Sequence, residues 1–152
     1  MDLASDPLPA AGRFVGAEHR YPLRVYFEDT DLSGIVYHAG YLRFMERARS
    51  DMLRCAGIDQ RGTFDRGEGV YAVAGLNIRY LKPARLDDDL VIVSRLNELR
   101  AATCLIHQTV RRGPEVLTEG DVRAAFLSLD GRPRRQPPAW IAIFERLMTE
   151  GD

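Results

Sequence analysis

Apolar residues recur from residue 41 to residue 56 with the three-and-four spacing of an amphipathic helix. Charged side chains fall mostly between them, so one face of this helix is predicted to be buried. Gly57 follows the last apolar position, where a left-handed residue commonly closes a helix. The predicted stripe consists of Tyr41, Phe44, Met45, Ala48, Met52, Cys55 and Ala56.

The remaining segments show a period of two or short apolar runs, which favours strands. Gly113-Pro114 predicts a hairpin turn, and residues 58–69, with three glycines, predict an exposed connection. A short apolar helix is expected at residues 139–148. The five predicted strands are residues 20–28, 70–81, 89–98, 102–111 and 115–129.

This order of elements indicates an α+β fold. A single long helix cannot supply the crossovers of a doubly wound parallel sheet. A five-stranded, mainly antiparallel sheet with that helix against one face satisfies the pattern. Residues 1–18 are rich in Pro, Ala, Gly and Asp and lack a period, which predicts a flexible N-terminal tail. One domain over residues 19–149 accounts for the rest.

Composition excludes several classes of partner. A formal net charge of −1 gives no electrostatic reason to expect binding to nucleic acid or acidic membranes. No apolar run approaches the ~18 residues of a membrane span, and the N-terminus lacks the features of a secretory signal. Cys55 and Cys104 have no metal-ligand spacing, so we expect buried free thiols and a cytoplasmic protein.

The densest polar motif is DTDLSG, residues 29–34, between the first predicted strand and the helix. It matches the first half of a calcium-binding EF-hand loop, but Gly40 stands where that loop needs a bidentate glutamate. It also resembles the DxDxS motif of haloacid-dehalogenase-type phosphatases, in which the first aspartate attacks phosphorus. That chemistry belongs to a parallel α/β sheet, so a phosphatase is only an outside option here.

A longer match covers VYFEDTDLSGIVYHAGYLRFMERARSDMLRCAGI, residues 25–58. It resembles the opening of hotdog-fold acyl-CoA thioesterases of the 4-hydroxybenzoyl-CoA thioesterase type, in particular the bacterial subgroup associated with the Tol–Pal system. Phe27 stands where tyrosine is usual. The resemblance continues through IRYLKPARLDDDLVI and GRPRRQPP. It implies a hotdog fold, with the sheet wrapped around the central helix, and hydrolysis of an acyl-CoA thioester.

The resemblance assigns the catalytic carboxylate to Asp31 and the oxyanion contact to the backbone N–H near His38, at the helix start. The first N–H groups of a helix lack internal partners and carry partial positive charge, so they can polarise a thioester carbonyl. Asp31 would attack the carbonyl or activate water, and the sequence leaves both routes open. By the same resemblance, the residues expected at the substrate are Gly34, Val36, Tyr37 and Tyr41, with Val73 and Gly75 lining the acyl channel from across a dimer interface.

Hotdog domains pair edge to edge, so the resemblance also implies a homodimer or a dimer of dimers. Coenzyme A enters as part of the acyl-CoA substrate, and no metal or redox cofactor is implied. Two alternatives with the same fold stay open, namely hydrolysis of acyl groups from acyl carrier protein and a non-catalytic scaffold.

Other polar residues have simpler interpretations. We expect Asp29 to cap its turn. Glu46 could pair with an arginine, which is the favoured interpretation, or could enter the site. His107 is expected to be satisfied within the sheet, and His19 to lie in the tail without a role. A further three arginines form a basic run that is either solvated or in contact with coenzyme A phosphates: Arg132, Arg134 and Arg135.

Overall fold

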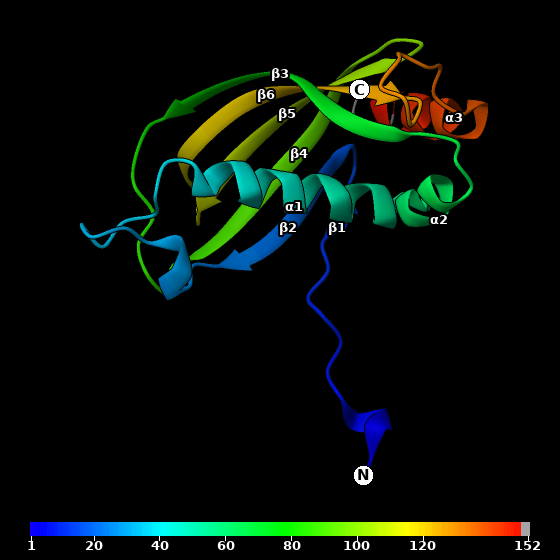
Figure 1. Cartoon of the computed structure of the whole chain (residues 1–152). Helices are drawn as coiled ribbons and strands as arrows, with labels where there is room; N and C mark the ends of the chain where they lie inside the picture. The colour runs from blue at the N-terminus through cyan, green and yellow to red at the C-terminus, as the bar shows by residue number, and fades with distance from the viewer. Residues whose placement is uncertain (150–152) are drawn as a thin grey trace.

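Six strands form one antiparallel sheet that curves around a long helix, α1 (Gly40–Cys55) (Figure 1). This computed structural model describes residues 1–149. The sheet has the order β1-β2-β4-β5-β6-β3. Its strands are β1 (Arg13–Val15), β2 (Glu18–Arg24), β3 (Val70–Tyr80), β4 (Asp89–Leu99), β5 (Thr103–Arg112) and β6 (Glu115–Leu127). The other elements are α2 (Gln60–Asp65), α3 (Pro138–Thr149) and the short 3-10 helices η1 (Leu3–Ser5) and η2 (Phe27–Asp29).

Helix α1 lies against the inner face of the sheet because both surfaces are apolar and exclude water from each other. Five residues of the predicted stripe are buried, from Tyr41 to Met52. Cys55, predicted to be buried, is exposed because the helix ends there and its thiol borders Gly12 at the surface. Within residues 1–149, no helix combines the length and apolar character needed to cross a bilayer.

The predicted end of α1 is confirmed. Gly57 has a φ of +86°, and the N–H of Ile58 returns to the carbonyl of Leu53 at 2.9 Å. The left-handed glycine lets the chain leave the helix axis sharply. Gly113, with a φ of +56°, likewise forms the predicted turn between β5 and β6.

The sheet has six strands instead of the predicted five. Strand β1 pairs with β2, with Phe14 opposite His19, so the unpaired tail is shorter than residues 1–18. A strand of three residues is too short to show a period, which is why the hydrophobic pattern did not predict it.

Two local elements also differ from prediction. The strand expected at residues 20–28 ends at Arg24, because the carboxylate of Asp29 accepts the N–H of Tyr26 at 2.8 Å and closes η2. The connection expected at residues 58–69 contains α2, which begins after Asp59. The Asp59 carboxylate accepts the N–H of Gly62 at 3.0 Å, a regular N-cap.

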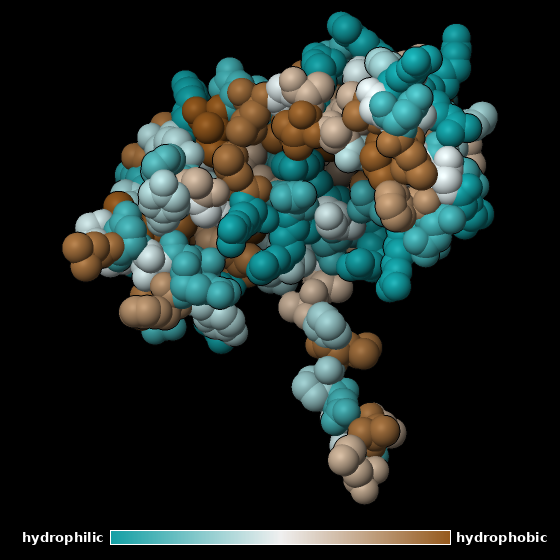
Figure 2. All heavy atoms as spheres, in the orientation of Figure 1, coloured by the Kyte–Doolittle hydropathy of each residue, from teal (hydrophilic) through white to brown (hydrophobic). Residues whose placement is uncertain are grey.

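Strand β3 forms an open edge of the sheet next to α1. Its inner-facing apolar side chains remain exposed, with 54% of Val73, 44% of Leu76 and 46% of Tyr80 accessible. In Figure 2, hydrophobic atoms gather along this upper side of the molecule. A long strand edge with exposed apolar residues is a surface on which another strand can pair.

Candidate active site

The DTDLSG segment forms a tight turn that holds the carboxylate of Asp31. Oδ1 of Asp31 accepts the N–H of Ser33 at 2.9 Å and its hydroxyl at 2.5 Å. Gly34, with a φ of +80°, reverses the chain, and Asp31 N–H donates to the carbonyl of Ile35 at 2.9 Å. The predicted turn at Gly34 is therefore confirmed, because that φ favours glycine.

These contacts favour the ionised form of the exposed Asp31 side chain. The hydrogen bond from the Ser33 hydroxyl is the largest cause that lowers the pKa of Asp31, followed by the bond from the Ser33 N–H. Asp31 is therefore a carboxylate at neutral pH, as both a nucleophile and a general base require.

Main-chain hydrogen bonds connect this turn to the start of α1. The N–H of Tyr37 donates to the carbonyl of Asp29 at 3.0 Å, and Thr30 forms a β-bridge with Val36. The N–H of Val36 also donates to the carbonyl of Ala84 at 2.9 Å, which anchors the turn to the loop before β4. The Asp31 turn and the helix start thus belong to one fixed segment.

The N-terminus of α1 has no side-chain cap. Ala39 occupies the N-cap position and offers no side-chain acceptor, while the N–H of Gly40 donates to the carbonyl of Tyr37 at 2.8 Å. The positive end of the helix dipole therefore faces the surface without a neutralising side chain. A carbonyl oxygen placed there would be polarised.

His38 lies at this helix start with an exposed side chain. Its ring lies 4.4 Å from the ring of Tyr37 and 6.3 Å from that of Tyr80, measured between centroids. Its carbonyl accepts the hydroxyl of Tyr80 at 2.7 Å. In the described part of the chain, no hydrogen bond joins His38 to Asp31, whose carboxylate stays within its own turn.

The other residues expected at the substrate divide into two groups. Val36 and Tyr41 are buried in the core, and the Tyr41 hydroxyl accepts the N–H of Ala84 at 3.0 Å. Their visible role is packing beneath the site, so contact with a substrate stays a prediction. Tyr37 is exposed beside the helix start, and Gly75 lies on the open edge of β3.

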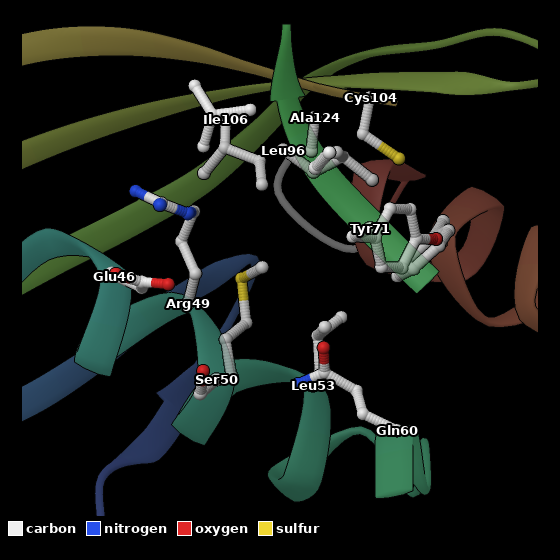
Figure 3. A pocket seen from close by; sticks show the side chains of 14 residues that line it. Glu46, Arg49, Ser50, Leu53, Gln60, Tyr71, Leu96, Cys104, Ile106 and Ala124 are labelled. Carbon is white, nitrogen blue, oxygen red and sulfur yellow. The ribbon is translucent and has the colours of Figure 1, made fainter. Parts of the chain in front are cut away.

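A cavity of about 180 Å³ lies between α1 and the sheet, next to β3 (Figure 3). Val73, expected in an acyl channel, contributes to its wall. Three polar residues of α1 border it: Glu46, Arg49 and Ser50. The apolar part of the wall includes Met52, Leu53, Leu96, Ile106, Ala124 and Phe144.

Arg49 extends from α1 toward the sheet and enters a buried polar network. It donates to Oε1 of Gln108 at 2.9 Å, and Nε2 of Gln108 donates to the Ser94 hydroxyl and the Met45 carbonyl, each at 2.9 Å. Burial lowers the pKa of the Arg49 guanidinium. This network was not predicted from the sequence, although Gln108 occupies an alternating position of an otherwise apolar strand face.

Glu46 is exposed at the same cavity. Glu46 was predicted to pair with an arginine, but none of the salt bridges found within residues 1–149 includes it. Its negative charge acts on Arg49 only at a distance, where it opposes the lowering of the Arg49 pKa. His107 is confirmed as a satisfied sheet histidine, with Nδ1 at 2.9 Å from Oδ1 of Asp121. Asp29 is confirmed as a turn cap through its bond to Tyr26.

Two further predictions concern the tail and the basic run. His19 is fully buried, with Nε2 at 2.8 Å from Oδ2 of Asp51, so the prediction that it lies in the tail without a role was wrong. Arg134 and Arg135 border an open groove beside α3, and Arg134 donates to the carbonyl of Glu68 at 2.5 Å. Contact of this run with coenzyme A stays a prediction.

The sequence matches a known protein family and several of its members. The sequence profile of the Thioesterase superfamily matches residues 33–119, a segment that begins just after Asp31 and includes α1 and the strands β3 to β5. Acyl-CoA thioesterase YbgC of Haemophilus influenzae is 38% identical over 109 residues, which cover 72% of this chain and 80% of that protein. Acyl-CoA thioester hydrolase YbgC of Escherichia coli is 35% identical over 129 residues, covering 84% of this chain and 96% of that protein.

A solved structure supports the same relationship. The crystal structure of a probable thioesterase from Bartonella henselae superposes with a TM-score of 0.75 at 35% sequence identity. The match covers 79% of this chain and 99% of the Bartonella chain. The superposed region therefore spans nearly the whole of that protein.

Proposed function

This chain belongs to the thioesterase superfamily, and we propose that it hydrolyses the thioester of an acyl-CoA to the free acid and coenzyme A. The observation that carries this proposal is the similarity to the two YbgC thioesterases, which extends over most of each protein. The hotdog fold, with its sheet around one long helix, is the corresponding architecture.

The proposed reaction uses the Asp31 turn and the start of α1. A thioester oxygen near the uncapped helix N-terminus would meet N–H groups that stabilise the negative charge of the tetrahedral intermediate. Asp31 supplies the carboxylate, either as a nucleophile that forms an anhydride or as a base that removes a proton from water. In the nucleophilic route the thiolate leaves as the anhydride forms, and water then hydrolyses the anhydride to release the free acid and restore Asp31. In the base route the attacking water becomes part of the free acid as the thiolate leaves. In both routes the departing thiolate takes up a proton.

A second copy of the chain is part of this proposal. Asp31 is exposed to solvent, and a carboxylate works better as a base or nucleophile when water is excluded. The open edge of β3 offers unpaired main chain and the exposed side chains of Val73 and Leu76. Antiparallel pairing of two β3 strands would bury these residues, and Gly75 with them, and extend the sheet across a homodimer.

The cavity beside β3 is the proposed acyl-binding space. Its wall is mostly apolar, and Val73 connects it to the open edge where the second copy would lie. We infer that its volume of about 180 Å³ limits the size of the acyl group. No metal is required for the proposed hydrolysis. The two cysteines are unpaired, which suits a reducing compartment such as the cytoplasm.

The decisive experiment measures release of free thiol from a panel of short, long and aromatic acyl-CoAs. Asp31→Asn keeps the shape of the turn but removes the negative charge, so kcat should fall by about 100-fold or more. Asp29→Asn is the matched control, because Asp29 only caps η2 and asparagine can still accept the Tyr26 N–H. Equal rates for wild type and Asp31→Asn would remove Asp31 from catalysis.

His38→Ala separates the backbone of the helix start from the imidazole. The N–H groups survive this change, so its loss of kcat should be smaller than that of Asp31→Asn. A larger loss would mean that the ring itself takes part. The same panel presented on acyl carrier protein tests the alternative thiol carrier, and a chain that cleaves neither form would be a non-catalytic scaffold.

A further inference from the structure

Four groups from three separate segments meet at the C-terminal end of α1. Oδ2 of Asp51 lies 2.8 Å from Nε2 of His19, 3.4 Å from Sγ of Cys55 and 2.8 Å from the N–H of Gly12. The nitrogen, oxygen and sulfur ligand atoms all lie within 4.8 Å of one another. Asp51 and Cys55 are four residues apart, so they share one face of α1.

The donor set matches a particular class of ion. Imidazole nitrogen, carboxylate oxygen and thiolate sulfur are the ligands that proteins use for Zn²⁺ and similar divalent transition metals. Tetrahedral coordination at the usual bond lengths would place ligand atoms roughly 3.3 to 3.8 Å apart, so the cluster needs only small shifts. The carbonyl oxygen of Gly12, 3.5 Å from Sγ of Cys55, borders the remaining position.

The surroundings favour a positive charge at this place. The Asp51 side chain is buried, and the partners that the structure gives it are the Gly12 N–H, the Cys55 thiol and the His19 ring, none of them a permanent cation. A buried carboxylate without a cation is costly. A divalent ion would compensate this charge directly.

The ligands can also release their protons. Nδ1 of His19 is buried without a hydrogen-bond partner in the described part of the chain, so moving the ring proton from Nε2 to Nδ1 breaks no bond there. The Cys55 thiol is exposed, so its proton can pass to solvent when sulfur binds the ion. The Gly12 N–H would continue to orient the carboxylate as an outer-shell contact.

The backbone at Gly12 is fitted closely to the cluster. A Cβ at this position would fall 2.8 Å from both Nε2 of His19 and Oδ2 of Asp51, so a larger residue would displace both ligands. The backbone at Gly12 therefore lies so close to these two ligand atoms that only glycine fits at this position.

We propose that His19, Asp51 and Cys55 bind a divalent transition-metal ion of the Zn²⁺ class at a structural site outside the catalytic turn. The bound ion would fasten the hairpin of β1 and β2 to the end of α1. The sequence shows no metal-ligand spacing around Cys55. His19 lies far away in the chain, and only the fold brings it next to Cys55.

The test uses the full chain without a histidine tag, stripped with a chelator and titrated with Co²⁺. We expect one ion per chain, with a thiolate-to-cobalt charge-transfer band in the near ultraviolet that Zn²⁺ abolishes by competition. Cys55→Ser should lose this band, and its affinity for Co²⁺ should fall by at least about ten-fold. Cys55 is exposed, so this variant is expected to fold. Zn²⁺ should raise the Tm of the wild type and not that of Cys55→Ser.

Cys104→Ser is the matched control. This second thiol is buried next to Gln136, at 3.1 Å from its Oε1, away from the cluster. It should retain both the band and the Zn²⁺-dependent rise in Tm. The proposal is overturned if saturating Co²⁺ gives no thiolate band, or if the band survives Cys55→Ser. In either case His19, Asp51 and Cys55 form a hydrogen-bonded cluster only.

Discussion

The hydroxyl of Tyr80, at the end of β3, donates a hydrogen bond of 2.7 Å to the carbonyl of His38, at the start of α1. This bond connects the open sheet edge to the helix N-terminus at which the thioester carbonyl is proposed to bind. Tyr80 is therefore a positioning residue: it fixes the backbone whose neighbouring N–H groups would contact the substrate oxygen.

Tyr80→Phe should lower kcat by about five-fold while KM changes little, because one hydrogen bond of ~1 kcal/mol no longer orients the helix start. Steady-state kinetics with a good acyl-CoA substrate measure both values. Tyr21→Phe, a half-buried tyrosine of β2, is the control and should behave as wild type. A change in KM alone for Tyr80→Phe would mean that the hydroxyl acts only in substrate binding.

Ser33→Ala should change the pH dependence of catalysis. The Ser33 hydroxyl is the largest cause of the lowered pKa of Asp31, so its removal raises that pKa toward the ordinary aspartate value. Because the reaction needs the carboxylate, activity is lost as pH falls through the Asp31 pKa, and the variant should lose activity at a higher pH than wild type.

The measurement for this variant is kcat/KM from about pH 3 to pH 6, a range that includes the ordinary aspartate pKa. Ser128→Ala, which removes a hydroxyl from a distant turn, should leave the acid limb in place. An unshifted acid limb in Ser33→Ala would show that this limb reports another group.

Leu76→Lys should separate the proposed dimer. The substitution places a charge in the middle of the open β3 edge, where burial would be costly. Light scattering should show a monomer, and circular dichroism should show an intact fold. The value of kcat/KM should fall by about ten-fold or more, because the second copy of the chain would no longer shield the Asp31 turn from water.

Val116→Lys provides the control for this change, since Val116 is an exposed apolar strand residue at the start of β6. It should leave both assembly and activity unchanged. A wild-type chain that is monomeric and fully active would contradict the proposal that a second copy completes the site.

Ala124→Leu should narrow the proposed acyl cavity. Ala124 lines its wall, so three added carbons would exclude long acyl groups and reduce kcat/KM for them by about ten-fold, while short acyl-CoAs are still cleaved. Ala125→Leu is the control, because the next residue of β6 points to the opposite face of the sheet. An unchanged chain-length profile for Ala124→Leu would place the acyl group elsewhere.

Gln108→Leu should destabilise the fold by about 1–3 kcal/mol, because the Arg49 guanidinium and the buried Ser94 hydroxyl lose their hydrogen bonds to the Gln108 side chain. Urea unfolding measures this change. Gln60→Leu on α2 is the control, since Gln60 is exposed. If Gln108→Leu proved as stable as wild type, the network would contribute specificity of packing and little stability.

Local sequence predicted most of the regular structure. The apolar stripe of α1, its end at Gly57 and the turn at Gly34 depend on residues close together in the chain, so spacing and glycine chemistry were sufficient. The long strands were predicted for the same reason, within a few residues of their ends. The DTDLSG–GIVYH motif predicted the family because it is long and specific.

The features that were missed depend on contacts between distant segments. The sequence alone determined which residues form α1 and the turn that presents Asp31. Only the tertiary structure decided that His19 meets Asp51 across 32 residues and that Gln108 accepts a hydrogen bond from Arg49. The physical reason is that hydrophobic period specifies which face of an element is buried, whereas its neighbours are selected by packing over the whole fold.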